Sequence, residues 1–137
     1  PAAIKALDAA LVSDPNYLPA HVRLIDLYRQ QKLYDKAEFH YRKALALHST
    51  AYMAEINYGR SLQDQGQTDP AAAAYRRAIK ADGGRAAGYL LLGRLLERKG
   101  NTSEALQQFR PRPAPVSPAA QRSMPAGQAQ PQLQSRR

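Results

Sequence analysis

The chain has 137 residues, 44% of them hydrophobic, and a mean hydropathy of −0.57, which suits about one domain built from amphipathic elements. The formal net charge is +9, and residues 111–137 contribute four arginines and no acid to it. Cysteine is absent and no apolar run reaches roughly 18 residues, which excludes a disulfide framework, a thiolate metal site and a membrane-spanning helix.

Apolar stripes, and the residues that end them, predict seven helices in chain order. The segment 14–16 (Asp-Pro-Asn) ends the first helix, and Gly66 and Gly100 stand where a left-handed C-terminal cap is expected. Asp69 and Pro70 indicate an N-cap followed by the first helical position. The loops are short, so successive helices are expected to be antiparallel. The predicted helices cover residues 2–13, 18–31, 35–48, 52–65, 69–82, 86–99 and 103–110.

Small and large apolar residues recur with a period of 34 residues, which is typical of a repeat architecture. In one helix of each unit, alanine is followed four positions later by Leu, Tyr or Phe on the same helix face. The other helix carries two large apolar residues at the same spacing. The first set is Ala3, Ala37, Ala71 and Ala105 with Leu7, Tyr41, Tyr75 and Phe109. The second set is Leu24, Tyr58 and Leu92 with Tyr28, Leu62 and Leu96.

This pattern resembles the tetratricopeptide repeat (TPR), and the resemblance covers residues 2–110. It implies an all-α fold, a right-handed α-solenoid of antiparallel helix pairs with about 3.5 units. Lys32 departs from the pattern at a turn where glycine is usual, and His21 and Glu55 stand at a position that is usually aromatic. The repeat domain is predicted over residues 1–110, with units at 1–17 (partial), 18–51, 52–85 and 86–110 (partial).

The resemblance also implies a scaffold or adaptor, in which the first helices of the units line a concave groove that binds a segment of another protein. The matching positions form an apolar strip edged by arginines. Such a strip suits an extended or helical partner with apolar anchors and acidic residues, because arginine binds carboxylates bidentately. In the alternative interpretation, Asp26 simply pairs with Arg60, and Glu97 with Arg94, as surface ion pairs. The predicted groove residues are Val22, Arg23, Asp26, Ile56, Asn57, Arg60, Leu90, Arg94 and Arg98.

The sequence contains no pattern that predicts catalysis, a cofactor or a metal ion. His40 and His48 are eight residues apart on one predicted helix, too far for a shared metal, and His21 lies on the preceding helix. Gly83 and Gly84 are not followed by the Lys-Ser/Thr pair of a phosphate-binding loop. We therefore expect no enzyme activity in this chain. A regulatory segment of a larger enzyme, for example a glycosyltransferase, is the alternative function.

Residues 111–137 contain six prolines, five glutamines and no aromatic residue, which predicts a disordered tail or linker. Two alternatives are a proline-rich ligand motif at 111–118 and binding of an anionic polymer by the arginines. Nucleic-acid binding is not favoured, because residues 1–110 lack a dense block of Lys and Arg. We also expect that the chain can associate with itself through open repeat ends. We expect the sequence to be a fragment or a processed chain, located in the cytoplasm or the periplasm.

Overall fold

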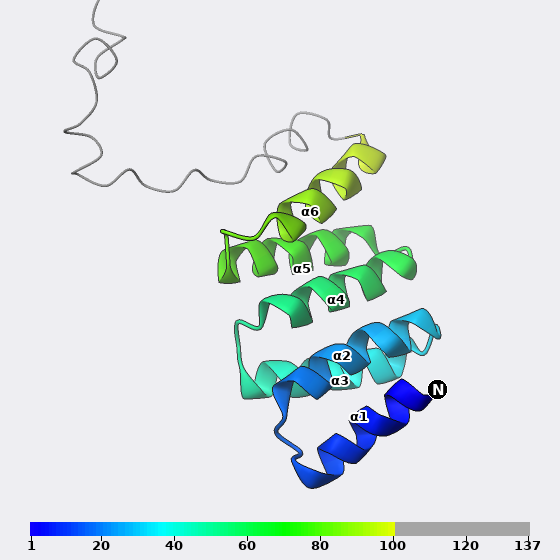
Figure 1. Ribbon diagram of the computed structural model, residues 1–137. Coiled ribbons are helices and arrows are strands. Elements are labelled where there is room, and N and C mark those ends of the chain that lie inside the picture. Colours follow the sequence, from blue (N-terminus) through cyan, green and yellow to red (C-terminus); the bar gives the residue numbers. More distant parts are fainter. Residues whose placement is uncertain (101–137) are drawn as a thin grey trace, which may run out of the picture.

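The computed structural model describes residues 1–100, which form six α-helices and, within that range, no strand. Figure 1 shows them stacked in chain order from α1 to α6. The six helices predicted within these residues are confirmed, and each boundary agrees to within one residue. The predicted helix at 103–110 and the predicted tail lie outside the described residues. The helices are α1 (Ala2–Ser13), α2 (Leu18–Gln30), α3 (Tyr34–Leu47), α4 (Tyr52–Asp64), α5 (Thr68–Ala81) and α6 (Ala86–Lys99).

Helices pack in pairs, and each pair packs on the next. The two most extensive interfaces are α2 with α3 and α4 with α5, which are the two complete helix pairs. Helix α4 also lies against both α2 and α3, whereas α6 packs on α5 and α1 packs on α2. Because contacts join only neighbouring units, the all-α solenoid predicted from the 34-residue period is confirmed.

The alanines of the repeat are the points of close helix approach. Ala37 and Ala44 on α3, and Ala71 and Ala78 on α5, have no exposed surface. A larger side chain at any of these positions would overfill a close-packed interior. The periodic small residues therefore set the distance within each helix pair.

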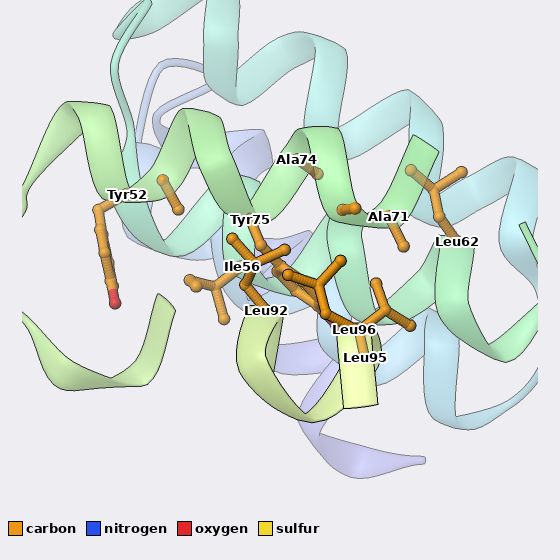
Figure 2. Packing of buried hydrophobic residues seen from close by; sticks show 11 residues of the cluster. Tyr52, Ile56, Leu62, Ala71, Ala74, Tyr75, Leu92, Leu95 and Leu96 are labelled. Carbon is orange, nitrogen blue, oxygen red and sulfur yellow. The ribbon is translucent and has the colours of Figure 1, made fainter. Parts of the chain in front are cut away.

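Large side chains fill the remaining space in two core clusters. The first lies between α1 and the start of α4 and includes Leu24 and Tyr41. The second joins α4, α5 and α6 around Tyr75, as Figure 2 shows. Tyr58 packs against both clusters, and its ring stacks on that of Tyr41 with centroids 3.8 Å apart. The two cores therefore meet at Tyr58.

Three turns use left-handed backbone. Gly66 and Gly100 have φ values of 76° and 89°, as their predicted capping role requires. Lys32 adopts φ 60° at the equivalent place, at the cost that a Cβ imposes in this region. Asp69 is not the N-cap of α5: the helix starts at Thr68 after Gln67, so Asp69 lies in the first turn. The Gln67 backbone N–H donates to the carbonyl of Leu62 on α4, which closes the turn before Thr68. Helix α5 can therefore begin one residue before the predicted start.

Candidate protein-binding groove

An arginine clasp joins α2 to α4 on the face formed by the first helices. Arg29 Nη2 and Nε donate to Asp26 Oδ1 at 2.8 and 3.1 Å, and Arg29 Nη1 donates to Asp64 Oδ2 at 2.8 Å. The sequence prediction that Asp26 pairs with Arg60 is wrong in its partner, because Arg29 is one helical turn away on the same helix. The clasp neutralises Asp26 and Asp64 within the protein.

Two predicted groove residues are part of the helix packing. Ile56 is only 1% exposed and belongs to the core shared by α4, α5 and α6. Asn57 is also buried, and its Nδ2 donates to the Val22 carbonyl at 3.1 Å, which fastens α4 to α2. Val22 itself is half-buried. The apolar column expected at these positions is thus mostly covered between Val22 and Ile56, and it reaches the surface at Leu90.

Three arginines of the predicted groove carry charge that the described residues do not neutralise. Arg60 on α4 is half-buried, and Arg94 and Arg98 on α6 are exposed. No ion pair joins any of the three to a carboxylate within residues 1–100, so the predicted Arg94–Glu97 pair is not formed. The sequence analysis predicts these three side chains at the edge of the apolar strip, and among residues 1–100 no carboxylate pairs with them.

Two of these arginines, Arg60 and Arg98, act on the Tyr75 hydroxyl through their charge. Burial raises the pKa of Tyr75 to about 12, and the positive charges of Arg60 and Arg98 oppose that rise. The hydroxyl donates to Gln63 Oε1 at 2.8 Å. Arg29 on α2 also opposes the rise and Asp64 on α4 adds to it, so charges from α2, α4 and α6 all act on this hydroxyl.

A cavity of about 350 Å³ with both polar and apolar walls lies at the other end of this face, between the starts of α2 and α4 and the loop before α6. Arg85 covers the Tyr52 ring, with its guanidinium carbon 4.3 Å from the ring centroid. Met53 is exposed beside it. The sequence analysis did not predict Tyr52, Met53 or Arg85 as site residues. The 34-residue period aligns Met53 with Ala87 on α6, the next first helix of a unit. Arg23 is exposed on α2, away from the clasp.

A buried polar cluster stabilises the opposite side of the stack. Glu55 is 4% exposed, and the Tyr41 hydroxyl contacts both of its carboxylate oxygens at 3.1 Å. Arg77 Nε donates to Glu55 Oε2, also at 3.1 Å. Burial raises the pKa of Tyr41 to about 12, and the negative charge of Glu55 adds to the rise. Glu55 at the usually aromatic position therefore joins α3, α4 and α5 through polar contacts.

Arg77→Met is expected to lower the free energy of unfolding by roughly 1 kcal/mol. The change leaves the Glu55 carboxylate buried with one hydrogen-bond donor fewer, but Arg77 is half-exposed, so water screens part of the loss. Urea unfolding followed by circular dichroism measures it. Lys80→Met, one turn along α5 on an exposed side chain, is the matched control. An equal loss in both variants would contradict the role of the cluster.

Residues 1–100 hold no group of three or more His, Cys, Asp or Glu side chains arranged to bind a metal ion. Within the same residues, no helix has the length and apolar character needed to cross a membrane.

Comparisons with known proteins agree with this architecture. A comparison with curated protein sequences gave no match. A solved structure described as the crystal structure of MamA is 25% identical, with a TM-score of 0.65 over 77% of this chain and 61% of the MamA chain. The MamA RS-1 ArsTM double mutant is 21% identical, with a TM-score of 0.66 over 77% and 60%. This chain thus spans about three fifths of the length of these MamA chains.

The family profile described as tetratricopeptide repeat matches residues 1–52 and 58–118, which is most of the chain. The match includes the periodic alanine and aromatic positions, five of the six described helices in full, and α4 except for residues 53–57. Sequence period, helix pairing and profile lead to one assignment: the chain belongs to the tetratricopeptide repeat family.

Proposed function

We propose that this chain is a scaffold whose groove, on α2, α4 and α6, binds an acidic segment of another protein with apolar anchors. The observation that carries the proposal is that Arg60, Arg94 and Arg98 pair with no carboxylate among residues 1–100, and that Leu90 is exposed one turn before Arg94. The TPR family supports a protein-interaction role in general. The arginines define which partner chemistry this particular surface favours.

The clasp at Arg29 divides the groove into two chemically different parts. Around Asp26 and Asp64 the charges are already paired within the protein, so a ligand carboxylate there would have to displace an existing ion pair. Around Arg94 and Arg98 no such competition exists among the described residues. The acidic residues of the partner are therefore expected over α4 and α6, and its apolar residues near Leu90 and the cavity beside Tyr52.

Arg60→Glu and Arg94→Glu are each expected to weaken binding of an acidic-apolar peptide about tenfold, which corresponds to about 1.4 kcal/mol for one charge contact. The probe is a fluorescein-labelled peptide of leucine and glutamate residues, compared with the same peptide carrying lysine in place of glutamate. Fluorescence anisotropy gives Kd at low and physiological salt. The lysine peptide is expected not to bind.

Lys80→Glu makes the same change of net charge on α5, outside the groove, and is the control. Its Kd is expected to stay within twofold of the unchanged protein. If both groove variants bind as tightly as the unchanged protein, the groove is not the binding site. If Lys80→Glu weakens binding as much as they do, the peptide senses only the overall charge.

A further inference from the structure

Two histidines from neighbouring helices meet in the interior. His21 on α2 and His40 on α3 are 5% and 8% exposed, and their Nδ1 atoms are 3.0 Å apart. The ring centroids are 5.3 Å apart, which is the nitrogen–nitrogen distance plus one ring radius on each side. The two Nδ1 atoms therefore face each other head on. A separation of 3.0 Å between these nitrogen atoms is that of a direct hydrogen bond. A metal ion bound to both would require the two Nδ1 atoms to point at a third position between the rings.

The backbone fixes the position of every proton in this pair. His21 Nε2 is 2.8 Å from the Pro15 carbonyl oxygen, which can only accept, so Nε2 carries the hydrogen. A neutral His21 then presents a lone pair at Nδ1, and His40 Nδ1 must be the donor. The result is a relay from His40 through His21 to the α1–α2 loop, with His40 Nε2 left unprotonated.

The pair can take up one proton but not two. A first proton enters at His40 Nε2 and leaves the bond between the Nδ1 atoms in place. A second proton would leave a hydrogen on both Nδ1 atoms, which face each other across 3.0 Å. The contact cannot survive that arrangement, because two donors would face each other in the absence of an acceptor.

Charges around the pair come from each neighbouring helix. Burial and the second ring disfavour a protonated His40 and lower its pKa from 6.5 to about 4. Asp8 on α1 acts in the opposite direction and favours the protonated ring. Tyr28 on α2 stacks on His40, and Lys36 lies over the Tyr28 ring. Lys43 on α3 lines a cavity of about 370 Å³ that both histidines border, and its walls are otherwise largely apolar.

We propose that the bond between His21 and His40 is an acid-sensitive latch that holds α1 and the loop at 14–17 on the α2–α3 pair. Helix α1 packs mainly on α2, and the His21 contact with Pro15 anchors the chain that links these two helices. At neutral pH the relay is complete. When both rings are protonated they turn apart, and the loop loses its anchor.

The sign of the effect follows from proton binding. The unfolded chain binds a proton on His40 as the pH falls through about 6.5, whereas in the folded protein burial and the neighbouring ring lower the pKa of His40 to about 4. Stability is therefore fully present above pH 6.5 and is lost progressively between pH 6.5 and 4. A shift of this size changes the unfolding equilibrium constant by about two orders of magnitude, at tenfold for each pKa unit.

The first test is made on the full chain. Nitrogen-15 NMR of the imidazoles at pH 7.5 is expected to show His21 protonated at Nε2 and His40 protonated at Nδ1. Hydrogen exchange, corrected for the intrinsic rate, is expected to show α1 losing protection at higher pH than α5. Protection lost together in α1 and α5, or His21 protonated at Nδ1 at pH 7.5, overturns the proposal.

Two variants separate the latch from ordinary acid unfolding. His40→Asn places an amide donor near the Nδ1 position and removes one titrating ring, so its loss of stability between pH 6.5 and 4 is expected to be much smaller. His48→Asn changes an exposed histidine beyond the end of α3 and is expected to keep the full acid step. Carboxylates titrate alike in all three proteins and cancel in the comparison. An acid step in His40→Asn equal to that of the unchanged protein contradicts the latch.

Discussion

Tyr75→Ala is expected to lower the free energy of unfolding by about 3–5 kcal/mol, the range for removing a large buried aromatic side chain. Tyr75 has no exposed surface and lies in the cluster formed by α4, α5 and α6 (Figure 2). Its ring occupies the space between Ile56 on α4 and Leu92 on α6. Its hydroxyl is bonded to Gln63, so the change also removes a polar contact. Neighbouring helices can close such a cavity only in part.

Urea unfolding followed by circular dichroism gives this difference, and two variants set its scale. Tyr75→Phe removes only the hydroxyl and is expected to cost about 1 kcal/mol. Tyr17→Ala changes a tyrosine that is 48% exposed in the α1–α2 loop and is expected to stay within about 0.5 kcal/mol of the unchanged protein. A Tyr75→Ala protein as stable as the Tyr17→Ala protein would show that the second core does not depend on this ring.

Gly59→Ala is expected to destabilise the protein by about 1–3 kcal/mol, although alanine is normally the better helix former by about 1 kcal/mol. A Cβ on Gly59 would lie 2.5 Å from Tyr75 Cε1 and 2.7 Å from Cδ1. The ring cannot move aside, because it is fully buried and bonded through its hydroxyl. The helix pair α4–α5 would have to separate, and contacts along the interface would weaken.

A double-variant cycle isolates this clash. In a Tyr75→Leu background the ring atoms nearest the new Cβ are gone, so Gly59→Ala is expected to be neutral or stabilising there. The same unfolding measurement on the four proteins gives the coupling energy. If Gly59→Ala costs as much with leucine at position 75 as with tyrosine, the cause lies in the backbone and not in the contact.

The fold could be predicted because every unit of a solenoid solves the same packing problem. Alanine at 37 and 71, and tyrosine at 41 and 75, meet the same neighbours one repeat apart, so their period reports the tertiary structure directly. The domain boundary near residue 110 and the properties predicted for 111–137 stay predictions, because they lie outside the described residues.

The groove was harder to predict because its charged side chains are long. Asp26 has Arg29 three residues away and Arg60 one repeat away, and the sequence does not decide which guanidinium reaches it. The structure selects Arg29, which also spans to Asp64 on α4. The periodic pattern placed Ile56 and Asn57 in the groove, but Ile56 lies in the core and the Asn57 side chain turns inward to the backbone of α2.

The buried polar contacts could not be predicted from spacing, since they join residues 19 and 22 positions apart on different helices. A signal was nevertheless present. His21 and Glu55 both stand at the position that is usually aromatic, and both are buried. A polar residue at a core position requires a hydrogen-bond partner, and His40 and Arg77 supply it. Departures from a repeat pattern thus indicated where to search.

Because Tyr58 packs against both cores, α4 is the helix through which the two halves of the stack are connected. On one side of α4, the stacked rings of Tyr41 and Tyr58 join it to α3. On the side toward α2, the ion pair between Arg29 and Asp64 joins the two helices. A change in the angle between the helices that meet at Tyr58 would change the distance between the Arg29 end and the Arg94 end of the proposed groove. If a segment binds along the proposed groove and contacts both ends, it would favour the arrangement of α2, α4 and α6 in which both ends are the right distance apart.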